Sequence, residues 1–130
     1  MSLKVRGIDH VVLRARDLAA MERFYVEVLG LAVERRQDII GLVQLRAGAQ
    51  LIDLVAAKGQ IGGGVDPTEA GRNLDHLCLN LEAFDLAAVI AHLEAHGATV
   101  GESGRRYGAG GFGVSVYLTD PEGNGLELRG

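Results

Sequence analysis

Hydrophobic and polar residues alternate along several short stretches of the chain. Over His76–Leu81, leucines take the odd-numbered positions and polar or small residues take the even ones. Val114–Thr119 repeats this pattern, with two valines and a leucine on one side and Ser, Tyr and Thr on the other. Because successive side chains of a strand point to opposite faces, each stretch predicts a β-strand with one apolar and one polar face.

Two other stretches carry apolar residues at helical spacing. Each begins with the tetrapeptide DLAA, at Asp17 and at Asp85, and each ends at a glycine, Gly30 or Gly97. An aspartate can accept the free N–H groups of a first helical turn, and glycine suits the left-handed position that follows a helix. The sequence therefore predicts two capped helices. Their apolar positions are Leu18, Met21, Phe24 or Tyr25, Val28 or Leu29, and then Leu86, Val89 or Ile90, and Leu93.

These predicted elements occur twice in the same order. Asp9-His10 and Asp75-His76 each open a strand that leads into a DLAA helix, and three more strands follow in each half. Those strands are Leu31–Arg36, Leu42–Arg46, Leu51–Val55, Thr99–Val100, Val114–Thr119 and Leu126–Arg129. The repeat predicts an α+β fold in one domain over residues 1–130. Its two modules, 5–56 and 73–130, are joined by a glycine-rich linker over 57–72.

Four side chains of the kind that bind metals fall at matching places in the two halves. His10 and His76 stand on the first strands, and Asp53 and Glu127 stand on the last strands. Strand alternation assigns all four to polar faces, and two curved sheets would gather them into one cleft. Two imidazoles and two carboxylates suit a divalent first-row ion, namely Ni, Zn, Mn, Co or Fe. With two open positions, such an ion would polarise substrate oxygens as a Lewis acid.

Each of these residues also has a purely structural interpretation. A single strand histidine is more often a surface or hydrogen-bonded residue, but independent placement rarely brings two histidines and two carboxylates to equivalent positions. Asp53 reaches one methylene less far than Glu127, so it either ligates the ion directly or binds it through water.

Other polar residues carry weaker signals. Asn80 and Tyr117 face the predicted cleft as substrate contacts or as packing residues, and Arg106 is a candidate for binding an anionic substrate. Cys78 is expected to fill a small buried apolar position rather than to act as a nucleophile. His92 and His96 have the i, i+4 spacing of metal ligands, but histidines near a helix C-terminus more commonly stabilise the helix dipole.

The segment YGAGGFG, residues 107–113, contains the pattern G-x-G-x-x-G of dinucleotide-binding proteins. That pattern binds a pyrophosphate only where it follows a strand and opens a helix, whereas here it precedes an alternating strand. We therefore predict no nucleotide site, and expect a flexible loop near the entrance of the cleft that could act as a lid.

Composition narrows the function classes. The chain has 130 residues, a formal net charge of −4 and no basic cluster, so we expect no nucleic acid partner. It has one cysteine, and its apolar runs are far shorter than the roughly 20 residues of a membrane span. The N-terminus also lacks the apolar core of a signal peptide. We expect a cytoplasmic protein with no membrane partner.

Three segments carry a family resemblance, and together they cover nearly the whole chain. GIDHVVLRARDLAAMERFYVEVLGL, LDHLCLNL and VYLTDPEGNGLEL resemble the glyoxalase/bleomycin-resistance/dioxygenase group, the vicinal oxygen chelate superfamily, and its small bacterial glyoxalase-like members. The resemblance implies paired βαβββ modules forming a cupped mixed sheet around one metal cleft. It implies metal ligands at His10, His76 and Glu127. The fourth family ligand, usually Glu or Gln, falls on Asp53.

The resemblance also implies an activity. We expect a divalent-metal-dependent lyase or isomerase of the glyoxalase type, which binds neighbouring oxygens of a small substrate. Glu127 is the first candidate for the base that moves the proton, and Asp53 is the second. The alternatives are a thiol transferase, a ring-cleaving dioxygenase and a non-catalytic antibiotic-sequestering protein. A homodimer is the expected assembly, and the cleft closes either within one chain or between two.

Overall fold

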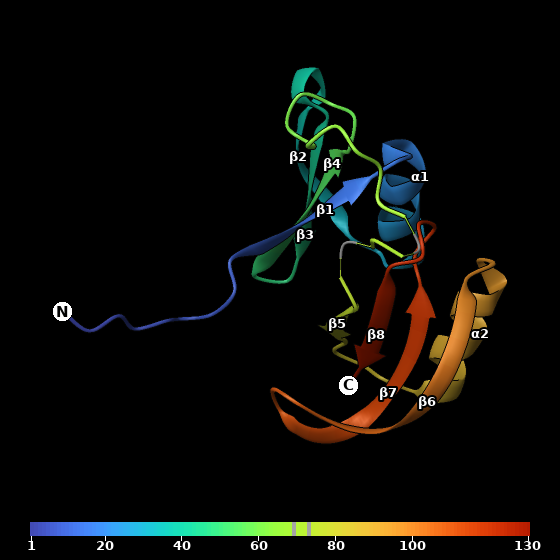
Figure 1. Ribbon diagram of the computed structural model, residues 1–130. Helices are drawn as coiled ribbons and strands as arrows, with labels where there is room; N and C mark the ends of the chain where they lie inside the picture. Colours follow the sequence, from blue (N-terminus) through green and yellow to red (C-terminus); the bar gives the residue numbers. More distant parts are fainter. Residues whose placement is uncertain (69, 73) are drawn as a thin grey trace. The chain divides into compact units, whose positions relative to one another are not determined.

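A computed structural model describes residues 1–68, 70–72 and 74–130, which fall into two compact units, Met1–Pro67 and Thr68–Gly130. Figure 1 shows a strand, a helix and a curved sheet in each unit. Residue 69 of the predicted linker and residue 73, the predicted start of the second module, lie outside the described residues. None of the helices that the described residues form is long and apolar enough to span a membrane.

The first unit is built on a four-stranded mixed sheet. Its strands have the order β1-β4-β3-β2, with β1 parallel to β4 and the other neighbours antiparallel. Its elements are β1 (His10–Ala15), α1 (Leu18–Arg23), a π-helical turn η1 (Phe24–Val28), β2 (Ala32–Gln37), a 3₁₀ turn η2 (Asp38–Ile40), β3 (Leu42–Ala47) and β4 (Gln50–Ala56).

The second unit repeats this topology, with the order β5-β8-β7-β6 and β5 parallel to β8. Its elements are β5 (His76–Asn80), α2 (Leu86–Ala95), β6 (Thr99–Gly108), β7 (Gly111–Thr119) and β8 (Gly125–Arg129). Even the irregularity of the outer strand pair recurs, because the register shifts after Val33 in β2 and after Val100 in β6. The predicted α+β class with two βαβββ modules is confirmed.

Both helices begin as the DLAA repeat predicts. Asp17 Oδ1 accepts the N–H of Ala20, and Asp85 Oδ1 accepts the N–H of Ala88, each at 3.0 Å. The chain leaves each helix through a left-handed glycine, Gly30 at φ 75° and Gly97 at φ 73°. The first helix differs from expectation in its second half, where η1 widens so that the N–H of Leu29 donates to the carbonyl of Phe24. Such widened turns occur as single π-bulges within helices.

Each unit buries its own apolar face. The helix contributes Met21 and Tyr25 to the first core and Leu93 to the second. The sheets contribute alternating aliphatic residues, which lie on the opposite face from the histidines. The sheet residues that are buried include Leu13, Val43, Leu45, Ile52 and Leu54 in the first unit, and Val116, Leu118, Leu126 and Leu128 in the second.

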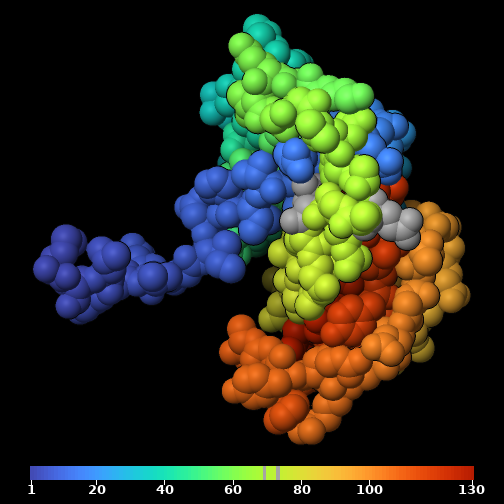
Figure 2. Space-filling view, viewed as in Figure 1, coloured from blue at the N-terminus to red at the C-terminus, as the bar shows by residue number. Residues whose placement is uncertain are grey.

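The expected loop over residues 107–113 is wrong. β6 continues from Thr99 to Gly108 rather than ending at Val100, and it pairs with β7 up to Gly108↔Gly111. Only Ala109 and Gly110 remain as a two-residue turn. Figure 1 shows this long curved hairpin extending beyond the ends of β5 and β8, and Figure 2 shows its projecting end in orange. Its many glycines obscured the alternating pattern that marks a strand in sequence.

Side chains on the outer face of the hairpin hold its end together. The rings of Tyr107 and Phe112 meet edge to face with their centroids 5.0 Å apart, and Arg105 lies 3.8 Å above the Phe112 ring. Directly opposed aromatic pairs of this kind stabilise antiparallel strands. The glycine-rich segment is therefore a paired hairpin.

Candidate functional site

Strand register places one histidine and one carboxylate side by side in each unit. In the first unit, Asp53 of β4 is opposite Val12, so His10, two residues earlier, shares its face. In the second unit, Glu127 of β8 is opposite Cys78, so His76 has the same relation to it. The parallel pairing of the first and last strands thus creates two equivalent half-sites.

The first half-site has a carboxylate with free bonding capacity. Asp53 is 5% exposed; its Oδ2 accepts from Gln44 Nε2 at 3.2 Å, while its Oδ1 is buried without a hydrogen-bond partner. The Nδ1–H of His10 donates to Asp9 Oδ1 at 2.6 Å, which leaves Nε2 as the nitrogen able to bind a metal. The bond to Asp9 holds the pKa of His10 above its ordinary 6.5, with the carboxylate charges of Asp53 and Asp9 adding to it against desolvation.

The second half-site has a carboxylate whose oxygens are both engaged. Glu127 is 6% exposed; its Oε2 accepts from Ser115 Oγ at 2.6 Å, and its Oε1 lies 3.4 Å from His76 Nε2. The Nδ1–H of His76 donates to Asp75 Oδ1 at 2.7 Å, as in the first half-site. Burial opposes ionisation of Glu127, but hydrogen bonds from Ser115 and Tyr117 and the nearby His76 together lower the pKa of this carboxyl.

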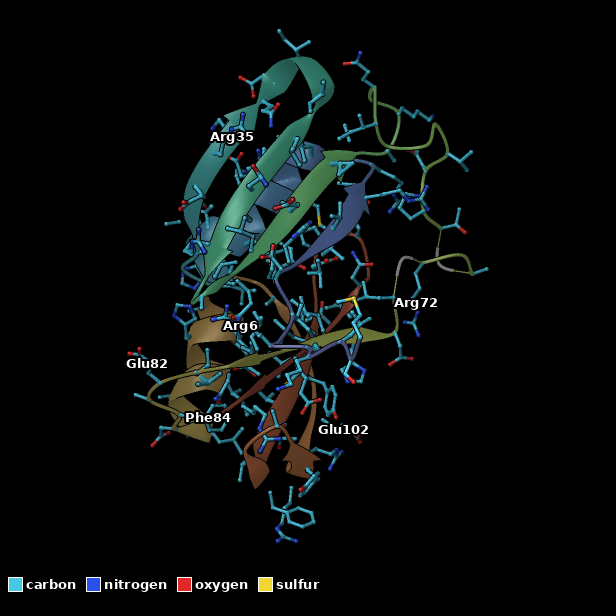
Figure 3. All side chains as sticks on the ribbon, turned by 90° about the vertical axis from the view of Figure 1, so that its left-hand side faces the viewer. Arg6, Arg35, Arg72, Glu82, Phe84 and Glu102 are labelled. Atoms are coloured by element: carbon cyan, nitrogen blue, oxygen red, sulfur yellow. The ribbon has the colours of Figure 1, made fainter. Side chains whose placement is uncertain are left out.

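Of the predicted substrate contacts, Tyr117 and Arg106 join the second half-site. The Tyr117 ring meets the His76 ring edge to face at 5.9 Å. Arg106 Nε donates to Tyr117 Oη at 3.2 Å, and its Nη2 donates to Glu102 Oε1 at 3.1 Å. Glu102 is the hairpin carboxylate labelled in Figure 3. Asn80 is exposed on the same strand face as His76, opposite Arg129.

Cys78 differs from expectation, because it is exposed rather than buried. It shares the polar face of β5 with His76 and Asn80, so the alternation of the strand prevents it from entering the core. Partial burial and the charge of Glu127 raise the pKa of its thiol to about 11, against an opposing effect of Arg129. A thiol that stays protonated at neutral pH is a poor nucleophile.

His92 and His96 form a local helix-end contact. Their rings lie 4.4 Å apart, and His96 Nδ1 donates to the carbonyl of His92 at 2.9 Å. This bond satisfies one of the last carbonyls of α2, in line with the helix-end interpretation of the sequence.

Sequence reasoning missed Ser115, Gln44 and Arg129. Ser115 and Gln44 are the hydrogen-bond donors to the two buried carboxylates. Arg129 is 8% exposed, and it shares the face of Glu127 because it lies two residues further along β8. The same strand alternation that identified Glu127 could have identified Arg129.

The donor atoms fit a divalent ion in three respects. Each unit offers one imidazole and one carboxylate, the ligands that suit first-row divalent ions. The unpartnered Oδ1 of Asp53 has bonding capacity to spare. The 3.4 Å between His76 Nε2 and Glu127 Oε1 is close to the separation of about 3 Å between adjacent ligands of one ion. No three His, Cys, Asp or Glu side chains of residues 1–68, 70–72 and 74–130 are grouped as a metal cluster.

Comparison with known proteins connects this architecture to a family. The profile of the Glyoxalase/Bleomycin resistance protein/Dioxygenase superfamily matches residues 7–128. Virulence protein STM3117 of Salmonella typhimurium is 32% identical over 124 residues, which cover 93% of this chain and 81% of that protein. Its crystal structure superimposes with a TM-score of 0.78 at 27% identity and covers 98% of both chains.

Two further relatives carry names of enzymes. The catechol-2,3-dioxygenase of Bacillus subtilis is 27% identical over 93% of this chain, which spans 40% of that protein. The lactoylglutathione lyase of Agrobacterium tumefaciens has a TM-score of 0.72 at 26% identity, over 97% of this chain and 94% of that one. The repeated βαβββ topology and the match over residues 7–128 lead to one conclusion: the chain belongs to the glyoxalase/bleomycin resistance protein/dioxygenase superfamily.

Proposed function

We propose that the protein is a divalent-metal-dependent lyase or isomerase of the glyoxalase type. In this proposal, His10, Asp53, His76 and Glu127 together hold one ion, either within one chain or between the two chains of a homodimer. The observation that carries the proposal is the equivalence of the two half-sites, each with a histidine on its first strand and a buried carboxylate on its last strand. The fold alone does not require a carboxylate at these buried positions.

The bound ion would supply Lewis acidity toward two neighbouring oxygens of a small substrate. Glu127 is the proposed base. Its lowered pKa keeps the carboxylate ionised at neutral pH, and its Oε1 faces the imidazole of His76. Ser115 orients the other carboxylate oxygen, so that a proton would be taken up at Oε1. Asp53 is the second candidate base, with Oδ1 as its available atom.

The neighbouring polar residues would bind the substrate. Tyr117 and Arg106 are hydrogen-bonded to each other, and Tyr117 also contacts the His76 ring. We propose that these two side chains orient the part of the substrate that does not bind the metal. Asn80 would contribute from the end of β5, on the same face.

A second candidate activity is a ring-cleaving dioxygenase. The observation that favours it is the match to a relative named catechol-2,3-dioxygenase over 93% of this chain. Two histidines and one carboxylate, here His10, His76 and Glu127, are also the ligand set of non-haem Fe(II) oxygenases. The chain spans only 40% of that relative, and this favours the glyoxalase-type activity as the first choice.

A screen of the metal-reconstituted protein tests the proposal. The protein is stripped with a chelator, loaded separately with Ni²⁺, Zn²⁺, Mn²⁺, Co²⁺ or Fe²⁺, and assayed with hemithioacetals, epoxide phosphonates and catechols. We expect metal-dependent conversion of hemithioacetals that is lost in His76→Ala. Conversion of catechols with Fe²⁺ alone would replace the proposal with the dioxygenase. Absence of metal binding would instead favour a sequestering protein.

A further inference from the structure

Arg129 is a buried cation without an ion pair. Its Nη2 donates to the carbonyl of Gly111 at 2.7 Å, but its Nη1 is buried and has no hydrogen-bond partner. No carboxylate among the described residues forms an ion pair with it. Burying an uncompensated charge costs several kcal/mol, so this arginine lowers stability unless a ligand supplies the missing negative charge.

The repeat shows that the fold does not need a cation at this position. Arg129 is opposite Ser115 and Asn80, and the equivalent residue of the first unit is Val55, opposite Leu42 and Arg14. Val55 is 3% exposed, so an aliphatic side chain fills the same place in the sheet of the first unit. The arginine is therefore a feature of the second unit's polar face.

Two glycines of the hairpin make room for the Arg129 guanidinium. A Cβ on Gly108 would lie 1.9 Å from Nη1, and a Cβ on Gly113 would lie 2.6 Å from Nη2. Neither glycine has a positive φ, so contacts rather than the backbone conformation exclude a side chain there. The contact at Gly108 is with the arginine alone, and at Gly113 it is with the arginine and with the carbonyl of Gly130. The Arg129 guanidinium therefore packs directly against the backbone of these two glycines of YGAGGFG.

Arg106 is accommodated in the same way on the same face. A Cβ on Gly104 would lie 2.8 Å from Arg106 Nη1. Arg106 is opposite Gly113, the glycine that lies against Arg129 Nη2, and Arg129 is opposite Ser115. The two arginines therefore lie on the same part of this face, near the serine that binds Glu127. The carboxylate partner of Arg106 is Glu102, which is 76% exposed and therefore a weak partner.

We propose that Arg129 and Arg106 form a binding site for an oxyanion group of the substrate, a carboxylate or a phosphonate. The anion would bridge Nη1 and Nη2 of Arg129 in a bidentate pair, taking the place of the Gly111 carbonyl, and would draw Arg106 from Glu102. This inference rests on the proposed function in one respect: the anion is taken to be part of the substrate that binds beside His76 and Glu127. Binding of the anion itself needs no metal.

The test uses metal-free protein kept in chelator at constant ionic strength. Inorganic phosphate, methylphosphonate and acetate are titrated separately, and the amide and arginine Nε–H signals are followed by NMR. We expect saturable shifts at Arg129 and at residues 108–113, including the amide of Phe112, whose nitrogen is bonded to the Gly111 carbonyl that loses its hydrogen bond from Arg129. A tighter Kd for acetate identifies a carboxylate substrate, and a tighter Kd for methylphosphonate identifies a phosphonate.

Variants separate the site from general charge attraction. Arg129→Met should weaken anion binding by about tenfold or more, and Arg106→Met by several-fold, because charge-assisted bidentate bonds are lost. Arg105→Met is the matched control. Arg105 is the neighbour of Arg106 in the sequence, but it stacks on Phe112 on the opposite face of the hairpin. This variant should bind like the wild type. Gly108→Ala, which displaces the guanidinium, should weaken binding even if Arg129→Met does not fold.

Two results would overturn the proposal. The first is the absence of saturable binding of all three anions to the wild type. The second is an equal loss of affinity in the Arg105 and Arg129 variants. Either result leaves the metal-dependent activity untouched, whereas a failed activity screen with intact anion binding would refute only the proposed reaction.

Discussion

The two units share a backbone topology but differ in the side chains of the polar face of the sheet. Strand order, parallel pairing, register shift, helix cap and Asp-His hydrogen bond are the same in both. The carboxylate of the first unit has one weak donor and one oxygen without a partner, whereas that of the second unit is hydrogen-bonded by Ser115 and faces His76. Where the first unit has Val55, the second has the buried Arg129. The repeat therefore preserves the backbone geometry, whereas a few side chains give the polar faces of the two units different chemistry.

The largest expected difference between the half-sites is in metal affinity. Glu127→Gln should weaken binding of Mn²⁺ or Zn²⁺ by roughly 100-fold, because the variant loses the charge of a pre-oriented ligand. Asp53→Asn should weaken it by only about tenfold if the shorter side chain binds through water. Competition with a chromophoric chelator measures both constants. The exposed Glu94→Gln on α2 serves as the control, and equal losses in the two site variants would show that the half-sites contribute alike.

The hydrogen bonds to the two carboxylates should differ in their effect on stability. Ser115→Ala leaves the buried Glu127 Oε2 without its donor, so the free energy of unfolding should fall by about 1–3 kcal/mol. Gln44→Ala should cost about 1 kcal/mol or less, since its bond to Asp53 is longer and only partly buried. Urea unfolding of the metal-free proteins measures both. A greater loss in Gln44→Ala would reverse the comparison.

Ser115 should also affect how much the free energy of unfolding falls at acid pH. The native pKa of Glu127 lies below its ordinary 4.5, so its ionised form stabilises the fold above that pH, and this contribution disappears as pH falls through the native pKa. Ser115→Ala removes one cause of the lowered pKa. Between neutral pH and about 3, the variant should therefore lose less stability than the wild type, as acid titrations followed by circular dichroism would show. Parallel curves for the two proteins would count against this role.

The helix caps should contribute equally to the two units. Asp17→Ala and Asp85→Ala each remove a side-chain acceptor for a first-turn N–H, at a cost of about 1 kcal/mol. Asp17→Asn and Asp85→Asn retain the acceptor and should stay close to the wild type. Thermal or urea unfolding measures the four variants. Unequal losses would indicate that the π-helical turn after α1 changes how much the cap stabilises that helix.

The smallest expected effect is on the titration of His10. The Asp9 carboxylate raises the pKa of this exposed imidazole, so Asp9→Asn should lower it toward 6.5. Because the native pKa is raised, any associated stabilisation is present at pH below 6.5 and is lost as pH rises through the native value. Imidazole NMR shifts across the titration measure the pKa. An unchanged value in Asp9→Asn would show that the hydrogen bond is absent in solution.

The sequence predicted those parts of the molecule that depend on short periodic patterns. The alternation around His76 and Glu127, the DLAA caps and the terminal glycines are local signals, and the structure contains each of them. The hairpin end was missed because four of the seven residues 107–113 are glycines, which carry no side chains to alternate. The packing of Arg129 against Gly108 and Gly113 was missed because it is a contact between residues from different strands. Local pattern cannot show such contacts.

Parallel pairing of first and last strands has a consequence for the order of folding. The chain that joins β1 to β4, and the chain that joins β5 to β8, each contains a helix and two further strands. Closing a loop of that length carries an entropic penalty, and such distant pairings form slowly compared with hairpins and helices. We therefore expect each histidine to reach its carboxylate late in folding. An intermediate that holds only hairpins and helices would lack both half-sites, so binding of an ion at either one would report that the sheet of that unit is complete.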